Sequence, residues 1–267
     1  MTKTVFITGA SSGIGRAAAR LFHEKGWNVV AAMRSPEREQ QFTDLERMLV
    51  TRLDVEDIGS IQKSVDTCVD SFGQIDVLIN SAGYGLMGVF ESATAEQIQK
   101  QYAVNVFGLM QMTQAVLPHM RARQNGTIIN ISSFGGVTAS KFATLYNSSK
   151  FAVEGFSEAL SHELAFLNIA VKIVEPGSVA TNFRNGMVLI QNSIDVYTPE
   201  FTSMLSRYAQ RTAHLQKATA DDIANTLYQA ATDNQIKLRY VAGDDAQFYI
   251  DAKLKNDEAD FLKIMRD

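Results

Sequence analysis

The stretch that most constrains the fold is a strand-like run followed by three glycines and a helical pattern, close to the start of the chain. The β-branched and aromatic run Val5–Thr8 is typical of a buried strand, Gly9, Gly13 and Gly15 follow it, and Arg16–Phe22 begins a strong helical pattern. A helix N-terminus presents unpaired N–H groups and a partial positive charge, and glycines let a phosphate approach the backbone closely. We interpret this segment as a phosphate-binding turn. The alternative is a strand–helix connection whose glycines only allow tight packing.

Further strand-like segments alternate with helical patterns along the rest of the chain. The seven expected strands are Val5–Thr8, Asn28–Met33, Leu49–Leu53, Val77–Asn80, Thr127–Ile131, Val171–Glu175 and Leu238–Ala242. Such alternation favours a parallel sheet with helices on both faces. With 46% hydrophobic residues and no linker or repeat, residues 1–267 are predicted to form a single doubly wound, Rossmann-type α/β domain with a sheet of six to seven strands.

The helical patterns differ in how clearly they begin and end. The first should run from about Gly13 to Lys25 and stop before Gly26. A long helix is expected from Thr94 to about His119, although Asn105 inside it is a poor helix-interior residue unless its side chain has a partner. The charged tail beyond Asp244 supports no prediction.

Composition and charge argue against several classes of partner. The formal charge of −4 shows no basic excess, so nucleic acid and anionic membranes are not expected partners. A single cysteine cannot form an internal disulfide, and no apolar run is long enough for an integral membrane segment. We expect a cytoplasmic protein. The four histidines are scattered without paired ligand spacing, so no metal site is predicted.

The end of the second strand bears on the choice of dinucleotide. An acid at this point would bind the ribose 2′-hydroxyl of NAD, but the chain reads Met33-Arg34-Ser35-Pro36. Arg34, together with Arg16 at the start of the first helix, could clamp a 2′-phosphate. NADP(H) is therefore predicted as the cofactor, and the alternative is that both arginines are solvated surface residues.

Thr8–Gly15, with the sequence TGASSGIG, resembles the cofactor turn of the short-chain dehydrogenase/reductase family. The resemblance extends in the family's order from about Thr4 to Ala242, through Asn105, Ser133, Tyr146-x-x-x-Lys150 and Pro176-Gly177. The segment Tyr84–Met87 is similar to the branch that contains hydroxysteroid and retinol dehydrogenases. Ser81 is a departure, because the family usually has asparagine there.

Tyr146 and Lys150 are the pair expected to carry the chemistry. Four residues apart on a helix, they share a face. A cation near the phenol favours its ionised form, so Lys150 is expected to lower the pKa of Tyr146 from its usual value of about 10. In carbonyl reduction Tyr146 would donate a proton to the oxygen, and Ser133 would hydrogen-bond the same oxygen. Lys150 would also hold the nicotinamide ribose, and the resemblance implies that Asn105 joins a proton relay.

The resemblance also implies which residues contact the dinucleotide. Asp54 and Val55 would lie under the adenine, and a Pro-Gly turn would lie against the nicotinamide. The complete expected set is Gly9, Ser11, Ser12, Gly13, Ile14, Gly15, Arg16, Arg34, Asp54, Val55, Asn80, Ala82, Gly83, Tyr146, Lys150, Pro176, Gly177, Val179 and Thr181.

The family's variable substrate lid corresponds to about residues 182–218, a segment rich in apolar residues from Phe183 to Tyr208. This density predicts a small lipophilic carbonyl or alcohol substrate, although about half of these residues could simply anchor the lid. Arg184, Arg207 and Arg211 could meet an anionic substrate, but solvated positions are favoured. Two functions stay open: an NADP(H)-dependent oxidoreductase acting on ketones, aldehydes or alcohols, and a binding module that senses NADPH without turnover. A homo-oligomer is expected from the resemblance alone.

Overall fold

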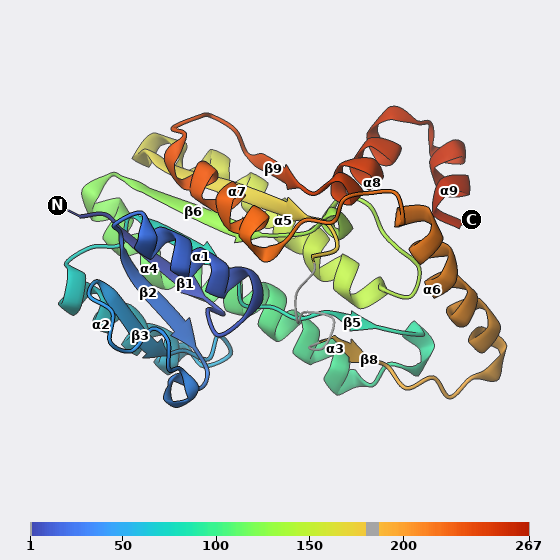
Figure 1. The fold of residues 1–267 in the computed structure, drawn as a ribbon, viewed down its shortest axis with the longest axis horizontal. Coiled ribbons are helices and arrows are strands. Elements are labelled where there is room, and N and C mark those ends of the chain that lie inside the picture. Colours follow the sequence, from blue (N-terminus) through green and yellow to red (C-terminus); the bar gives the residue numbers. More distant parts are fainter. Residues whose placement is uncertain (1, 180–186, 267) are drawn as a thin grey trace.

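The structure is a computed structural model that describes residues 2–179 and 187–266. Its centre is a seven-stranded parallel sheet in the order β3-β2-β1-β4-β6-β7-β9, which confirms the predicted doubly wound domain (Figure 1). The strands are β1 (Thr4–Thr8), β2 (Asn28–Met33), β3 (Met48–Arg52), β4 (Val77–Asn80), β6 (Gly126–Ile131), β7 (Ile169–Pro176) and β9 (Arg239–Ala242). The order reverses between β1 and β4, and ligands of such sheets bind at the carboxyl ends beside this reversal.

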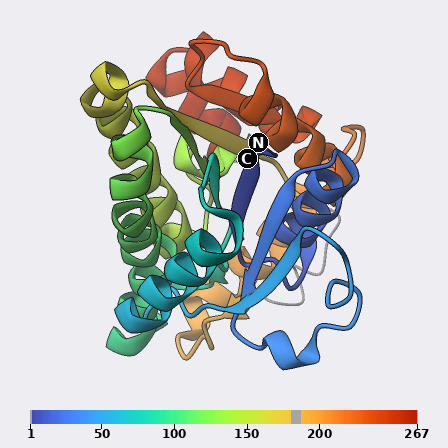
Figure 2. The ribbon, with the colours of Figure 1, turned by 90° about the vertical axis from the view of Figure 1, so that its left-hand side faces the viewer.

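Helices cover both faces of this sheet, as Figure 2 shows. They are α1 (Gly13–Glu24), α2 (Ile58–Phe72), α4 (Leu109–Arg123), α5 (Thr144–Leu164) and α7 (Ala220–Thr232). Val5 and Ile7 of β1 pack into the core shared with α1 and α7, whereas Phe6 packs into the core shared with α2, α4 and α5. Successive side chains of a strand point to opposite faces, so a strand buried on both sides reads as a continuous apolar run.

The long helix expected from Thr94 to His119 is interrupted, so this prediction is wrong in detail. A regular helix α3 (Ala95–Tyr102), capped by Thr94 and Gln97, leads into the π-helical segment η3 (Ala103–Gly108), and α4 follows. Gly108 lies so close to Val55 that a Cβ there would come within 2.8 Å of the valine. Single π-helical turns inside α-helices are often found at functional sites, and this one contains Asn105.

Segments outside the main sheet gather at one end of it (Figure 1). Two short strands, β5 (Leu86–Met87) and β8 (Val188–Leu189), pair in parallel, and the helices here are α6 (Thr198–Thr212), α8 (Asp244–Lys255) and α9 (Glu258–Arg266). The charged tail that supported no prediction is therefore helical. Short helical turns complete the description: η1 (Pro36–Arg38), η2 (Phe90–Ser92), η4 (Phe134–Gly136), η5 (Ala165–Leu167) and η6 (Asp195–Tyr197).

Only some of the apolar side chains described in the expected substrate lid are buried. Ile190 is buried against Leu86 and Leu145, but the β8 side chains and Val196 are exposed. Among the described residues, no helix is both long and apolar enough to cross a membrane.

Candidate active site

The glycine turn after β1 has the geometry of a dinucleotide cradle. Gly9 and Gly13 have positive φ angles of 69° and 56°, which favour glycine. A Cβ on Gly9 would lie 2.9 Å from the Ala82 backbone, and one on Gly15 would lie 2.5 Å from the Gly9 carbonyl oxygen. Ser12 precedes α1 in an extended conformation without a side-chain cap, and the first turn contains no acid. The N–H groups at this helix start are thus suited to a pyrophosphate, and the residues present fit a dinucleotide.

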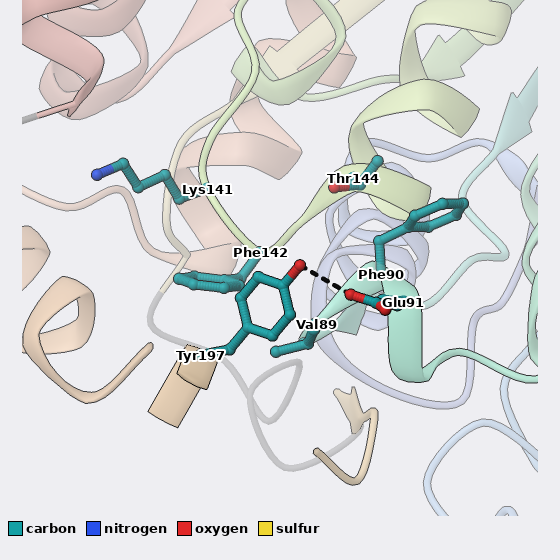
Figure 3. Close-up of a pocket in the computed structure, with 8 residues that line it drawn as sticks. Val89, Phe90, Glu91, Lys141, Phe142, Thr144 and Tyr197 are labelled. Carbon is teal, nitrogen blue, oxygen red and sulfur yellow. Dashed lines mark hydrogen bonds between the residues drawn. The ribbon is translucent and has the colours of Figure 1, made fainter. Parts of the chain in front are cut away.

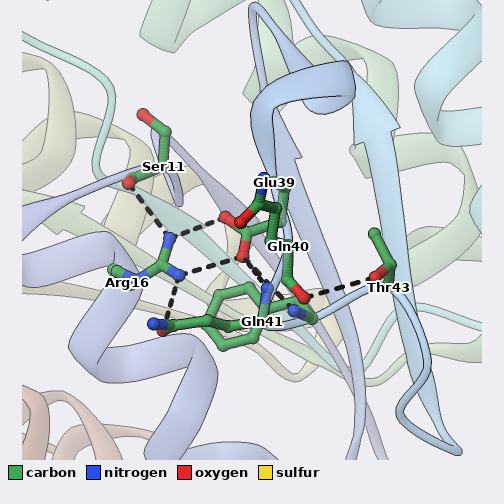
Figure 4. Close-up of polar contacts among 7 residues, drawn as sticks. Ser11, Arg16, Glu39, Gln40, Gln41 and Thr43 are labelled. Atoms are coloured by element: carbon green, nitrogen blue, oxygen red, sulfur yellow. Dashed lines mark hydrogen bonds and ion pairs between the residues drawn. The ribbon is translucent and has the colours of Figure 1, made fainter.

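Arg16 does not lie ready for a 2′-phosphate, contrary to the prediction. Its two terminal nitrogens donate to the Glu39 carboxylate at 2.6 and 2.9 Å, to the Ser11 carbonyl at 3.2 Å and to the Gln41 side chain at 2.8 Å (Figure 4). Its guanidinium also lies 4.6 Å from the centroid of the Phe42 ring. Since a guanidinium has five N–H donors, four of them are already used. The loop that follows β2 therefore supplies a partner for Arg16 that no sequence pattern predicts.

Glu39 is built into this contact. The carboxylate is 4% exposed and also accepts from the backbone N–H groups of Gln41 and Phe42. The hydrogen bonds with Arg16 are the largest cause that lowers the pKa of Glu39, so the residue is charged at neutral pH. By contrast, Arg34 at the end of β2 is exposed and makes no ion pair with the described residues. Arg34 is therefore a cation without an ion-pair partner among the described residues.

The other residues expected on the adenosine side differ in how far they are buried and in what their side chains bind. Val55 is buried against the η3 segment, and Asp54 is partly exposed and accepts from the Glu56 N–H at 3.1 Å. Asn80 is different, because its amide donates to Thr113 at 3.1 Å and Asn130 at 2.9 Å inside the core. The Asn80 side-chain amide is therefore used inside the core, and the expected contact of this residue with the cofactor stays a prediction.

The turn after β4 is held by a residue that the sequence analysis missed. Thr8, at the end of β1, is buried, and its hydroxyl accepts from the N–H groups of Ser81 and Ala82 at 3.0 Å each. These bonds fix the Ala82–Gly83 turn opposite the glycine turn. A polar residue at the end of a buried strand was the signal that could have identified it.

Ser133 and Tyr146 come together at the carboxyl ends of the strands. Ser133 lies two residues after the end of β6 and is 5% exposed. Its hydroxyl accepts a hydrogen bond from the Gly135 N–H at 3.1 Å. The same hydroxyl lies 3.4 Å from the Pro176 carbonyl oxygen, to which it can donate. Tyr146 lies in the first turn of α5 and is hydrogen-bonded to Ser133. The structure thus brings together the serine and tyrosine that the sequence placed thirteen residues apart.

Lys150 lies on the same face of α5 as Tyr146, but it does not lower the pKa of the phenol as expected. The Lys150 ammonium donates to the Ile131 carbonyl at 2.8 Å, and its nitrogen is 5.8 Å from the centroid of the Tyr146 ring. Burial raises the pKa of Tyr146, and the hydrogen bond with Ser133 opposes this rise. Burial also lowers the pKa of Lys150 to about 8, against the attraction of Glu154 one turn along α5.

Asn105 is buried within η3 and links the two sides of the site. Its amide donates to the Tyr84 carbonyl at 3.0 Å and to the Ser149 hydroxyl at 3.2 Å, while its carbonyl accepts from the Tyr84 N–H at 3.0 Å. These bonds are the partners that make asparagine acceptable inside a helix. Ser149 precedes Lys150, so Asn105 is placed next to the lysine without contacting it directly.

The Pro176-Gly177 turn is held by α8, which the sequence analysis did not connect with the site. Asp245 is fully buried and accepts from the Ser178 N–H at 2.6 Å. A Cβ on Gly177 would lie 1.9 Å from this carboxylate, so the position requires glycine. Val179 is partly exposed beside the turn, whereas Thr181, Phe183 and Arg184 lie outside the described residues.

A pair of buried carboxyls lies behind α5. Glu154 and Glu175 share Arg239, whose Nε is 3.0 Å from one and 3.4 Å from the other. Burial, together with the nearby Glu154 charge, raises the pKa of Glu175 to about 8. Two like charges in one buried place cannot both ionise easily, so this pair retains a proton near neutral pH.

A cavity of about 420 Å³ opens between η2, the start of α5 and η6. Its walls include Phe90, Phe142 and Tyr197, and the Tyr197 hydroxyl donates to Glu91 at 2.9 Å (Figure 3). Aromatic walls with a few polar groups are typical of small-molecule sites. The described residues contain no group of three or more His, Cys, Asp or Glu side chains placed to hold a metal ion.

Comparisons with known proteins agree with this geometry. The family model described as short chain dehydrogenase matches residues 3–189. An uncharacterized oxidoreductase of Schizosaccharomyces pombe is 39% identical over 236 residues, which cover 88% of this chain and 98% of that protein. Human retinol dehydrogenase 8 is 33% identical over 262 residues, which cover 89% of this chain and 82% of that protein.

A solved structure shows the same architecture. A short-chain dehydrogenase from Streptomyces avermitilis superimposes with a TM-score of 0.85 at 30% identity, covering 98% of this chain and 96% of that one. The family match spans most of the chain, and the glycine turn, Ser133, Tyr146 and Lys150 occupy one end of the sheet. The chain is therefore an oxidoreductase of the short-chain dehydrogenase/reductase family.

Proposed function

We propose that the chain is an NADP(H)-dependent oxidoreductase that interconverts a lipophilic ketone or aldehyde and its alcohol, with Tyr146 as the acid/base. The observation that carries this proposal is the hydrogen-bonded pair of Ser133 and Tyr146, with Lys150 behind it on α5. A bound nicotinamide would supply the hydride. The protein's own part is to orient the carbonyl oxygen, stabilise developing negative charge and deliver a proton.

The phenol of Tyr146 would deliver that proton. Because burial raises its pKa, the hydroxyl stays protonated at neutral pH, which suits a proton donor. Ser133 would hydrogen-bond the same carbonyl oxygen as it becomes negative, a role for which the hydroxyl is already oriented by the Gly135 N–H.

The preference for NADP(H) rests on Arg34. It is exposed at the end of β2, where an acid would favour NAD, and it has no ion-pair partner among the described residues. Gly9, Gly13 and Gly15 would admit the pyrophosphate to the start of α1. Titration with both cofactors tests the preference, and equal affinity for NADPH and NADH would contradict it.

The lipophilic substrate rests on the aromatic cavity and on the relatives. Phe90, Phe142 and Tyr197 provide apolar walls close to the start of α5. Tyr146 lies two residues after this helix begins at Thr144. The similar human protein is named retinol dehydrogenase 8, and retinol is a lipophilic alcohol. Together these features support an apolar carbonyl compound rather than a small, fully charged one.

We also propose that two copies of the chain associate through α5 and the neighbouring η3 segment. Phe151 of α5 is 45% exposed and Phe107 of η3 is 53% exposed, and these two elements pack against each other. Exposed aromatic side chains on adjoining elements mark a surface that is usually covered. A second copy would bury them.

The experiment that tests the catalytic assignment is Tyr146→Phe. The variant loses one oxygen and keeps the ring, so it should fold and bind NADPH normally while turnover falls by about two to four orders of magnitude. Wild type and variant are compared on a panel of ketones and aldehydes by NADPH absorbance, with Tyr102→Phe as the matched control. An unchanged rate would refute the assignment. NADPH binding without turnover on the whole panel would support the sensing module instead.

A further inference from the structure

A second, smaller cavity of about 40 Å³ lies where α6, α8 and α9 meet the loop before α5, at the right-hand end of Figure 1. We call it the arginine pocket, because its lining includes Lys141, Arg207, Arg211 and Arg266 beside the rings of Tyr208 and Tyr249. A water molecule occupies about 30 Å³ of liquid, so the pocket has room for one compact polar group.

Positive charge exceeds negative charge around this pocket. Of the carboxylates described nearby, Glu200 lies at the rim and binds Lys141 at 2.8 Å and Arg207 at 2.5 Å. Asp245 lies behind the Tyr249 ring and is committed to the Ser178 N–H. Among the described residues that line the pocket, four carry a positive side chain and none carries a carboxylate. Arg211 makes no ion pair with the described residues, and the Tyr249 hydroxyl near it is buried without a hydrogen-bond partner.

Lys141 lines both cavities, but its ammonium group lies on the side of the smaller one. In Figure 3 its side chain extends away from the aromatic walls of the larger cavity. The ammonium donates to Glu200 and, at 2.6 Å, to the Arg266 carbonyl. The apolar and cationic spaces therefore lie next to each other, on either side of the Lys141 backbone.

A short aromatic stack joins the pocket to the candidate reacting centre. Phe134, which directly follows Ser133, stacks on Tyr249 with ring centroids 5.0 Å apart, and Tyr249 stacks on Tyr208 at 6.1 Å. The Tyr208 hydroxyl is hydrogen-bonded to Ser178 in the turn after Pro176. This packed stack connects the candidate reacting centre with the lining of the arginine pocket.

We infer that the arginine pocket binds a compact oxyanion, a carboxylate above all, at the far end of an amphipathic carbonyl substrate. Arginine is the side chain best suited to hold such a group, since its planar donors match two oxygens at once. The inference rests on the proposed function and narrows its substrate to an apolar carbonyl compound with one anionic end. Under this inference Arg207 and Arg211 would bind the anionic substrate, which is the alternative that the sequence analysis did not favour.

The test compares straight-chain keto acids with their methyl esters in a series of chain lengths. The two members of each pair differ by one negative charge and by the methyl group of the ester. At the chain length that spans the two sites, kcat/KM for the acid should exceed that for the ester by about tenfold or more, with the difference in KM rather than kcat. Arg207→Gln and Arg211→Gln should each remove most of this advantage and leave the ester unaffected. Lys63→Gln, an exposed cation on α2, is the control and should change neither.

A binding measurement keeps the inference falsifiable without turnover. Calorimetric titration of the NADPH-loaded protein with a long-chain fatty acid should show binding that Arg211→Gln weakens about tenfold. Equal kcat/KM for acid and ester at every chain length would overturn the inference while leaving the reductase assignment intact. Absence of turnover on all carbonyls would instead overturn the proposed function. Fatty-acid binding that is absent, or equal in wild type and Arg211→Gln, would also overturn the pocket assignment.

Discussion

Glu39→Gln should strengthen the binding of NADPH without changing that of NADH. In the folded protein Glu39 occupies both terminal nitrogens of Arg16, and four of the five guanidinium donors are used. Glutamine has the same shape and can still accept from the Gln41 and Phe42 N–H groups, but it carries no charge to hold Arg16. The released guanidinium would then reach the 2′-phosphate beside Arg34.

The magnitude follows from the number of bonds gained and from their exposure. A hydrogen bond with a charged partner contributes about 1.5–3 kcal/mol, which corresponds to a ten- to hundredfold change in affinity. The Arg16 side chain is 29% exposed, so solvent screening favours the lower figure. We therefore expect the Kd of NADPH to fall by about tenfold.

The assay is fluorescence titration of both cofactors against wild type, Glu39→Gln and Glu37→Gln. Glu37 is an exposed acid two residues away, so its variant changes the net charge equally without touching Arg16. The expected pattern is tighter NADPH binding in Glu39→Gln alone, with NADH binding equal in all three proteins. Weaker or unchanged NADPH binding would refute the reasoning and would show that Glu39 holds Arg16 in its binding position.

Two further predictions concern stability and assembly. Since the pKa of Glu175 is raised to about 8 from its ordinary value of 4.5, the folded chain keeps a proton that the unfolded chain loses, and stability should fall as the pH rises through this window. Glu175→Gln should flatten the Tm profile there and raise the Tm at pH 8, and a profile parallel to wild type would contradict this. Replacing Phe107 and Phe151 together with glutamate should reduce the mass measured by light scattering to that of one chain if α5 and η3 form the contact between copies. A mass equal to that of wild type would exclude this surface.

Most of the fold could be predicted because its signals are local. The apolar run of β1, the glycines after it and the N-terminal start of α1 lie within a few residues of one another, and the family's order placed Ser133 and Tyr146 together. The break at η3 also had a signal, since Asn105 and Gly108 are both poor residues for a helix interior. Asn105 alone does not predict a break, because a partner for its side chain also makes it acceptable inside a helix.

The remaining features depend on contacts between distant parts of the chain. Nothing near Arg16 indicates that Glu39 will fold back onto it, because the loop after β2 has no periodic pattern. Burial raises the pKa of Tyr146 and outweighs the opposing hydrogen bond with Ser133, and a sequence pattern does not show how deeply the phenol is buried. Asp245 was overlooked within a charged tail, although Gly243 followed by two acids is a reasonable start for a helix.

Asp245 makes the reacting end of the site depend on a segment that is synthesised after every strand of the main sheet. A nascent chain that has emerged only as far as β9 already contains every strand of the main sheet and the glycine turn. It still lacks the carboxylate that holds the Ser178 N–H and the Tyr249 ring that stacks on Phe134. The dinucleotide cradle can therefore form during translation, whereas the carbonyl-facing turn is fixed only after α8 has left the ribosome and packed.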